Sequence, residues 1–162
     1  MTTPRNVLFL CTGNSARSIL AEAILRHDGK GRYQAFSAGS MPTGTPNPAA
    51  IAILQARGLD HSFARSKSWD EFAGDTAADI DLVITVCANA AGEVCPVWPG
   101  HPYTAHWGVE DPAAATGSRQ DIMAAFAVTY DQMKARIDAL LALGDAPLAD
   151  LMPQIHTIGE LP

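Results

Sequence analysis

Apolar residues occur along the chain in short continuous runs, separated by longer stretches with helical spacing. Two expected strands, 5–10 and 81–86, contain the apolar runs VLFL and LVI, which are typical of strands buried on both faces of a parallel sheet. Residues 32–38 alternate between polar and apolar side chains and predict a strand at the edge of the sheet. A short fourth strand is expected around 104–107.

Apolar positions three and four residues apart predict helices between and after these strands. The main helices are expected at 17–27, roughly 48–57 and 118–143, the last with Ser118 or a neighbour as its N-cap. A short helix is expected to begin at Ser68, because Glu71 three residues later fits a capping box. Residues 145–162 contain three prolines and are expected to form an irregular C-terminal extension.

The order of these elements predicts an α/β fold: a three-layer domain in which helices flank a small parallel sheet of about four strands. We expect residues 1–144 to form a single catalytic domain and residues 145–162 to extend from it. The length of 162 residues fits one domain, and 48% apolar with 17% charged residues is typical of a globular protein.

The net charge of the chain disfavours some classes of binding partner. The net charge is -6 and basic residues are not clustered, which argues against nucleic acid or an anionic membrane. The longest apolar runs are too short to span a bilayer, and the N-terminus lacks the pattern of a signal peptide. We therefore expect a cytoplasmic protein. Because thiols stay reduced there, three cysteines indicate chemistry or metal binding more than structural disulfides.

The residues between the first strand and the first helix have the composition of an anion-binding loop. The N–H groups of such a loop and the N-terminus of the following helix face a common point. Cys11 lies at its floor, where this field favours the nucleophilic thiolate. Arg17 offers a planar fork to two anion oxygens, and Ser18 is placed to donate a hydrogen bond to the sulfur. The expected oxyanion-binding residues are Thr12, Gly13, Asn14, Ser15, Ala16, Arg17 and Ser18.

Cys11, five intervening residues and Arg17 resemble the phosphate-binding loop of the low-molecular-weight tyrosine phosphatases and of the thioredoxin-coupled arsenate reductases that share their fold. The resemblance to the arsenate reductases extends to about residue 143. It implies that Asp111, which precedes Pro112, is the general acid that protonates the departing oxygen, with Glu110 as the weaker candidate. The simpler alternatives are a buried structural cysteine at position 11 and a turn residue at position 111.

The resemblance also implies a role for the other two cysteines. Reducing arsenic from the +5 to the +3 state takes two electrons, and a thiol pair that becomes a disulfide supplies two. Cys11 would attack arsenate, Cys87 would then attack the sulfur of Cys11 and release arsenite, and Cys95 would convert this disulfide to Cys87–Cys95. Thioredoxin, or a glutaredoxin system as the less favoured donor, would reduce it, with no bound cofactor. A metal half-site at Cys87 and Cys95 is disfavoured by its wide spacing, so no metal is expected.

Two other functions fit the same loop. A tyrosine phosphatase would simply hydrolyse a phosphocysteine, but phosphatases of this family place tyrosines directly after the Asp-Pro pair, where this chain has three alanines, 113–115. A phosphocysteine carrier domain would have no need of Arg17 and Asp111. In some relatives a cation binds near the positions of Asn14, Glu22 and Lys67, so the Lys67 ammonium is a candidate substitute for that cation.

Overall fold

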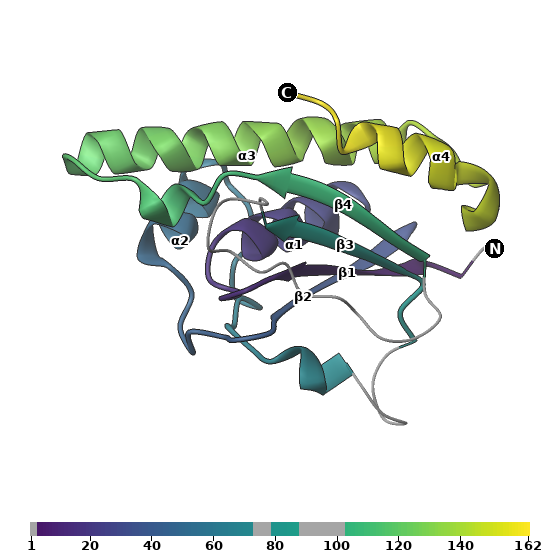
Figure 1. Cartoon of the computed structure of the whole chain (residues 1–162), viewed down its shortest axis with the longest axis horizontal. Coiled ribbons are helices and arrows are strands. Elements are labelled where there is room, and N and C mark those ends of the chain that lie inside the picture. Colours follow the sequence, from purple (N-terminus) through teal and green to yellow (C-terminus); the bar gives the residue numbers. More distant parts are fainter. Residues whose placement is uncertain (1–2, 73–78, 88–102) are drawn as a thin grey trace.

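The computed structural model describes residues 3–72, 79–87 and 103–162. They contain a four-stranded sheet in which all neighbouring strands are parallel, in the order β2-β1-β3-β4 (Figure 1). The strands are β1 (Arg5–Cys11), β2 (Tyr33–Gly39), β3 (Leu82–Cys87) and β4 (Tyr103–Val109). The expected strands and the edge position of β2 are confirmed, and β4 is longer than its sequence pattern predicts.

The strands hold their places because side chains on both faces of β1 are buried. Val7, Phe9 and Cys11 pack into the larger core cluster on one face. Leu8 and Leu10 belong to a smaller cluster on the other face. Burial on both faces fixes the register of the central strand, because a slip of one residue would exchange the two sets of side chains.

Helices cover the two faces unequally. The helices are α1 (Arg17–Asp28), α2 (Pro48–Ala56), α3 (Arg119–Leu141) and α4 (Leu148–Ile158), with short 3-10 helices η1 (Trp69–Phe72) and η2 (Pro112–Ala114). Buried residues of all four α-helices belong to the larger cluster, whereas Trp69 and Phe72 of η1 pack against the smaller one. The predicted three-layer α/β architecture is confirmed. No helix in the described ranges has both the length and the apolarity needed to cross a bilayer.

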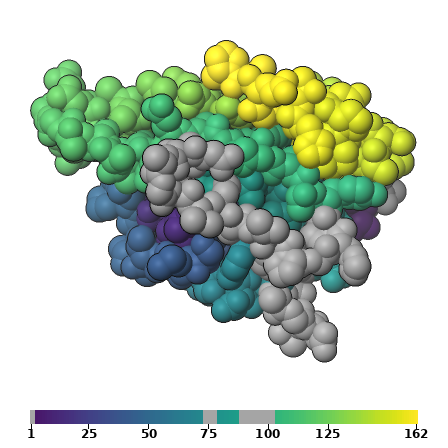
Figure 2. Space-filling model, in the orientation of Figure 1, coloured from purple at the N-terminus to yellow at the C-terminus, as the bar shows by residue number. Residues whose placement is uncertain are grey.

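The prediction that residues 145–162 are irregular is wrong, because they contain α4. Its buried residues, Leu151, Met152, Ile155 and Ile158, recur at helical spacing. The Trp107 Nε1–H of β4 donates to the carbonyl of Ile155 at 2.9 Å. Figure 2 shows α4, in yellow, lying alongside the green α3. Pro147 precedes the helix, and the exposed Pro153 is tolerated inside it, so burial of one apolar face outweighs the low helix propensity of proline.

The capping box expected at Ser68 and Glu71 is also not formed. The Ser68 Oγ accepts a hydrogen bond from the Asp70 N–H at 3.1 Å, and only a turn of 3-10 helix follows. The Glu71 carboxylate turns to Arg65 instead, with 2.7 Å between Oε1 and Nη2. A charged partner for Glu71 therefore replaces the backbone N–H that the pattern suggested. The capping box forms at α3, between Ser118 and Asp121.

Candidate active site

The loop between β1 and α1 lies at the carboxyl edge of the sheet, where the strand order changes direction, the usual place for ligands in such folds. Asn14 has a φ of 45°, the left-handed conformation expected for this turn. Three backbone N–H groups of the segment 41–47 donate hydrogen bonds of 2.8–3.0 Å to carbonyl oxygens of the loop. The acceptors are the carbonyls of Thr12, Gly13 and Ser15. The loop is therefore held by a second segment that runs beside it.

Cys11 lies at the floor of this loop and is 2% exposed. The backbone N–H of Asn14 donates to its Sγ at 3.2 Å. The Ser18 hydroxyl lies 2.9 Å from the same sulfur. Ser18 Oγ already accepts a hydrogen bond from the Asn14 side-chain amide at 2.8 Å, which leaves the hydroxyl proton free to point at the sulfur. Two donors aimed at Sγ suit a thiolate acceptor.

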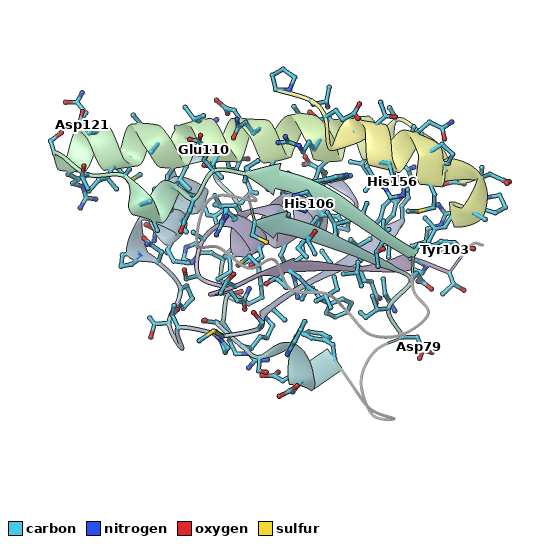
Figure 3. All side chains as sticks on the ribbon, in the orientation of Figure 1. Asp79, Tyr103, His106, Glu110, Asp121 and His156 are labelled. Atoms are coloured by element: carbon cyan, nitrogen blue, oxygen red, sulfur yellow. The ribbon has the colours of Figure 1, made fainter. Side chains whose placement is uncertain are left out.

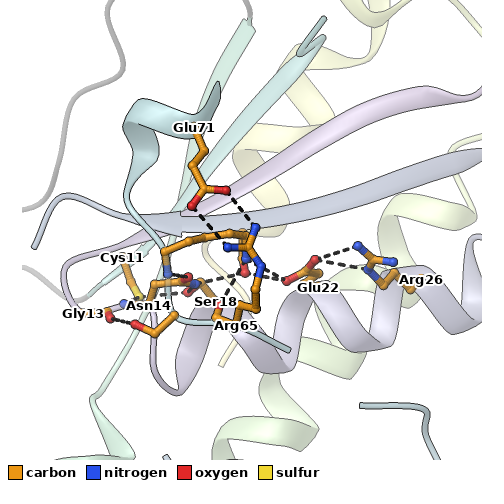
Figure 4. A network of polar contacts seen from close by, with 11 residues as sticks. Cys11, Gly13, Asn14, Ser18, Glu22, Arg26, Arg65 and Glu71 are labelled. Atoms are coloured by element: carbon orange, nitrogen blue, oxygen red, sulfur yellow. Dashed lines mark hydrogen bonds and ion pairs between the residues drawn. The ribbon is translucent and has the colours of Figure 1, made fainter. Parts of the chain in front are cut away.

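The side chain of Asn14 is fully buried, and each of its polar atoms has a partner. Its Oδ1 accepts from the backbone N–H of Lys67 at 2.9 Å. Its Nδ2 donates to Ser18 and, at 3.0 Å, to Ser37 on β2. The Ser37 hydroxyl donates in turn to Oε1 of Glu22 at 2.5 Å. A continuous chain of hydrogen bonds thus joins the sulfur of Cys11 to a buried carboxylate on α1 (Figure 4).

Glu22 and Lys67 form a buried pair at the far end of this chain. They are 1% and 7% exposed, and Lys67 Nζ lies 3.9 Å from Glu22 Oε1. Arg26 Nη2 contacts the other carboxylate oxygen at 3.0 Å. Burial raises the pKa of Glu22 and lowers the pKa of Lys67, and in each case the charge of the partner opposes the shift. An ammonium therefore occupies the neighbourhood that the sequence comparison associated with a cation.

Arg17 and Asp111 meet above the loop. Arg17 is 5% exposed, and its Nη1 donates to the carbonyl of Val109 at 3.3 Å. Its Nη2 lies 3.8 Å from Asp111 Oδ2. Asp111 is held from the other side, because its Oδ1 accepts from the Ala113 N–H at 3.0 Å. Asp111, rather than the neighbouring Glu110, is thus the acid that pairs with Arg17, and its side chain keeps 41% of its surface exposed.

The second cysteine, Cys87, ends β3, the strand next to β1. Its side chain is fully buried, in the same core cluster as Cys11. Cys87 is disulfide-bonded, whereas Cys11 is a free thiol. The third predicted site cysteine, Cys95, lies outside the described residues.

Two groups at the site were not predicted. Ser37 bridges Asn14 and Glu22, and its only signal in the sequence is a serine in an otherwise apolar part of β2. The Val109 carbonyl anchors Arg17, and a backbone carbonyl carries no signal at all in sequence. Within the described part of the chain, histidine, cysteine and acidic side chains form no group of three placed to hold a metal ion.

The chain is similar in sequence to known proteins. Residues 6–150 match the family model of the low molecular weight phosphotyrosine protein phosphatases. The chain is 35% identical over 139 residues to an arsenate reductase of Shouchella clausii, which covers 86% of this chain and 96% of the relative.

Solved structures give the same picture. An arsenate reductase in the phosphate binding state superposes with a TM-score of 0.69 at 29% identity, covering 85% of this chain and 97% of the other. A thioredoxin-dependent arsenate reductase of Corynebacterium glutamicum superposes with a TM-score of 0.60 at 27% identity. That match covers 88% of this chain and 63% of the other.

Proposed function

The chain belongs to the low molecular weight phosphotyrosine protein phosphatase family, and we propose that it reduces arsenate to arsenite with Cys11 as the nucleophile. The observation that carries the proposal is the free thiol of Cys11, which contacts the Asn14 N–H and the Ser18 hydroxyl, in a loop that leads to the Arg17–Asp111 pair, while a second cysteine ends the adjacent strand. The curated relatives of similar length that the chain matches at about 35% identity are named arsenate reductases.

The first step captures the oxyanion. The loop N–H groups and the Arg17 guanidinium hold the arsenate oxygens, and the Cys11 thiolate attacks arsenic. A sulfur–arsenic bond forms as one arsenic–oxygen bond breaks. Asp111 gives its proton to the departing oxygen, which leaves as water rather than as a costly oxyanion. Arsenic is still in the +5 state at this point, so this step alone resembles phosphatase chemistry.

The second step transfers the electrons. The Cys87 thiolate attacks the sulfur of Cys11, a disulfide forms, and the sulfur–arsenic bond breaks with its electron pair left on arsenic. Arsenite, in the +3 state, departs. The register of β1 and β3, which pairs Leu10 with Thr85, would place Cys11 level with Val86 if it continued. The Cα atoms of Cys11 and Cys87 would then be about 6 Å apart, within the span of a disulfide.

The third step restores Cys11. The thiolate of Cys95 attacks Cys87, which gives a Cys87–Cys95 disulfide and releases Cys11 as a free thiolate. A structure in which Cys11 is free and Cys87 is disulfide-bonded is compatible with the end of this step. A dithiol protein must then reduce the disulfide. We assign this role to thioredoxin, because one structural relative is named a thioredoxin-dependent arsenate reductase.

The phosphatase alternative is less well supported. The residues that follow Asp111 and Pro112 include Ala113 and Ala115, which line a cavity of about 530 Å³. Alanines at positions 113 and 115 offer less surface to a phenol ring than tyrosines would. The phosphatase reaction would also leave the cysteine at the end of β3 without a role.

Trapping of the first disulfide tests the proposed steps. Reduced Cys95→Ser protein should form a Cys11–Cys87 disulfide when arsenate is added and release an equivalent amount of arsenite, because the resolving thiol is missing. Cys11→Ser and Cys87→Ser variants should form none. Phosphate is the matched control, since it fills the same loop but accepts no electrons from thiols. Disulfide formation with phosphate, or none with arsenate, would refute the mechanism.

A further inference from the structure

The register between β3 and β4 shifts next to Cys87. From the pair Leu82–Tyr103 to the pair Thr85–His106, both strands advance one residue at a time. The next pair is Cys87 with Val109. Two residues of advance on β3 therefore match three on β4. The strand β4 contains one extra residue in the pair Trp107 and Gly108, opposite Val86, which is a β-bulge.

Glycine at position 108 fits the space that this bulge leaves. A Cβ atom there would lie 3.0 Å from the carbonyl oxygen of Cys87 and 2.7 Å from His106 Nε2. The His106 ring, which projects from β4 (Figure 3), is held by a 2.7 Å contact of its Nδ1 with the Thr85 hydroxyl. Any side chain at position 108 would therefore press on the backbone of Cys87 and on this ring.

The extra residue determines how far along the sheet each later residue of β4 lies relative to β3. With the bulge, Val109 lies opposite Cys87, and its carbonyl accepts the hydrogen bond from Arg17. Asp111, two residues later, reaches the same guanidinium. Without the bulge, Val109 and Asp111 would each be displaced along the strand by about 3.3 Å relative to Cys87.

Cys87, at the end of β3, packs in the same core cluster as Cys11. On β3, Leu82, Ile84 and Val86 pack into the larger core cluster, whereas Val83 faces the smaller one. Strict alternation would put Cys87 on the same side as Val83. Cys87 nevertheless packs in the larger cluster with Cys11.

From these contacts we infer that Gly108 is a positioning residue for the reaction: lacking a side chain, it lets β4 pass close to the Cys87 carbonyl without displacing Cys87, and its bulge brings Val109 and Asp111 to Arg17. The inference rests on the proposed role of Cys87 as the second thiol. Gly108 itself touches no reacting atom. Its substitution should therefore slow the transfer of electrons between the two cysteines, whereas the Asn14 N–H and the Ser18 hydroxyl, which contact the Cys11 sulfur from outside β4, should stay in place.

The test compares two reactions of Cys11 in the Cys95→Ser background, with and without Gly108→Ala. The rate of the arsenate-dependent Cys11–Cys87 disulfide should fall at least about 10-fold, because a displacement of under 1 Å at a reacting group already has large effects on rate. The rate at which iodoacetamide alkylates Cys11, with no arsenate present, should stay the same. Equal disulfide rates with and without the substitution, or a parallel fall of both reactions, would overturn the inference.

A second variant separates the two crowded contacts and relieves strain in case Gly108→Ala folds poorly. Adding His106→Ala removes the ring but leaves the Cys87 carbonyl 3.0 Å from the new Cβ. The disulfide should remain slow. Full recovery would show that only the histidine ring was disturbed and would refute the role given to Gly108. If the Cys95→Ser protein with Gly108 intact forms no disulfide with arsenate, the proposed function fails, and the role of Gly108 falls with it.

Discussion

At the scale of single residues, the site is organised around a buried chain of hydrogen bonds. Lys67 donates its backbone N–H to Asn14, which fixes the direction of the amide. Both amide hydrogens are then committed to serines, one of which faces Cys11 and the other Glu22. The orientation of the buried Asn14 amide therefore determines which hydrogen bonds the Cys11 sulfur receives. Substitution of any residue in this hydrogen-bonded chain should alter those hydrogen bonds.

The raised pKa of Glu22 predicts how stability depends on pH. Between its usual value of 4.5 and the higher value in the folded protein, the folded state binds more protons than the unfolded state. Stability contributed by Glu22 therefore falls as pH rises through this window. In urea denaturation, the free energy of unfolding of the parent minus that of Glu22→Gln should decrease as pH rises from about 4.5 and then level off.

Glu71→Gln provides the opposite control. The Arg65 hydrogen bond lowers the pKa of the exposed Glu71, so its small contribution is present above 4.5 and is lost as pH falls through the folded pKa. The difference between the parent and this variant should thus change in the other direction. A flat difference for Glu22→Gln across the window would contradict the assignment of a buried carboxyl with a raised pKa.

At the scale of secondary-structure elements, burial of apolar side chains determines which structure forms when local sequence signals conflict. Leu148, Leu151, Ile155 and Ile158 have the spacing of an amphipathic helix, so the sequence contains a signal for α4 that its prolines obscure. The Glu71 carboxylate had two possible partners, and the distant Arg65 outweighs the local cap. The bulge in β4 is marked in the sequence only by Gly108, and its place depends on the register of β4 against β3.

Ile155→Ala tests how much α4 contributes. The side chain is fully buried against the sheet, and its removal should lower the free energy of unfolding by about 3 kcal/mol through lost burial and the cavity that remains. His156→Ala, one residue along on the exposed side of the same helix (Figure 3), should change it by less than about 0.5 kcal/mol. Similar values for the two variants in urea denaturation would mean that α4 does not form part of the core.

At the scale of the whole molecule, a parallel sheet gathers at one edge the groups that we propose to react. Cys11 and Cys87 end neighbouring strands, and Asp111 follows the end of a third. The sequence predicts this convergence, because parallel strands present their carboxyl ends together. It does not reveal Ser37 or the Val109 carbonyl, because neither differs from ordinary strand residues until the fold brings them beside Asn14 and Arg17. The sequence therefore predicts the chemistry better than the groups that orient it.

The most direct test of the account is arsenate-dependent oxidation of NADPH with thioredoxin and thioredoxin reductase, measured for the parent and for Cys87→Ser. Sustained turnover by the parent and none by the variant are expected, because the variant lacks the thiol that supplies the electrons to arsenic through Cys11. Equal turnover by both proteins would contradict the role of Cys87. No turnover by the parent, together with efficient hydrolysis of phosphotyrosine, would identify a phosphatase instead.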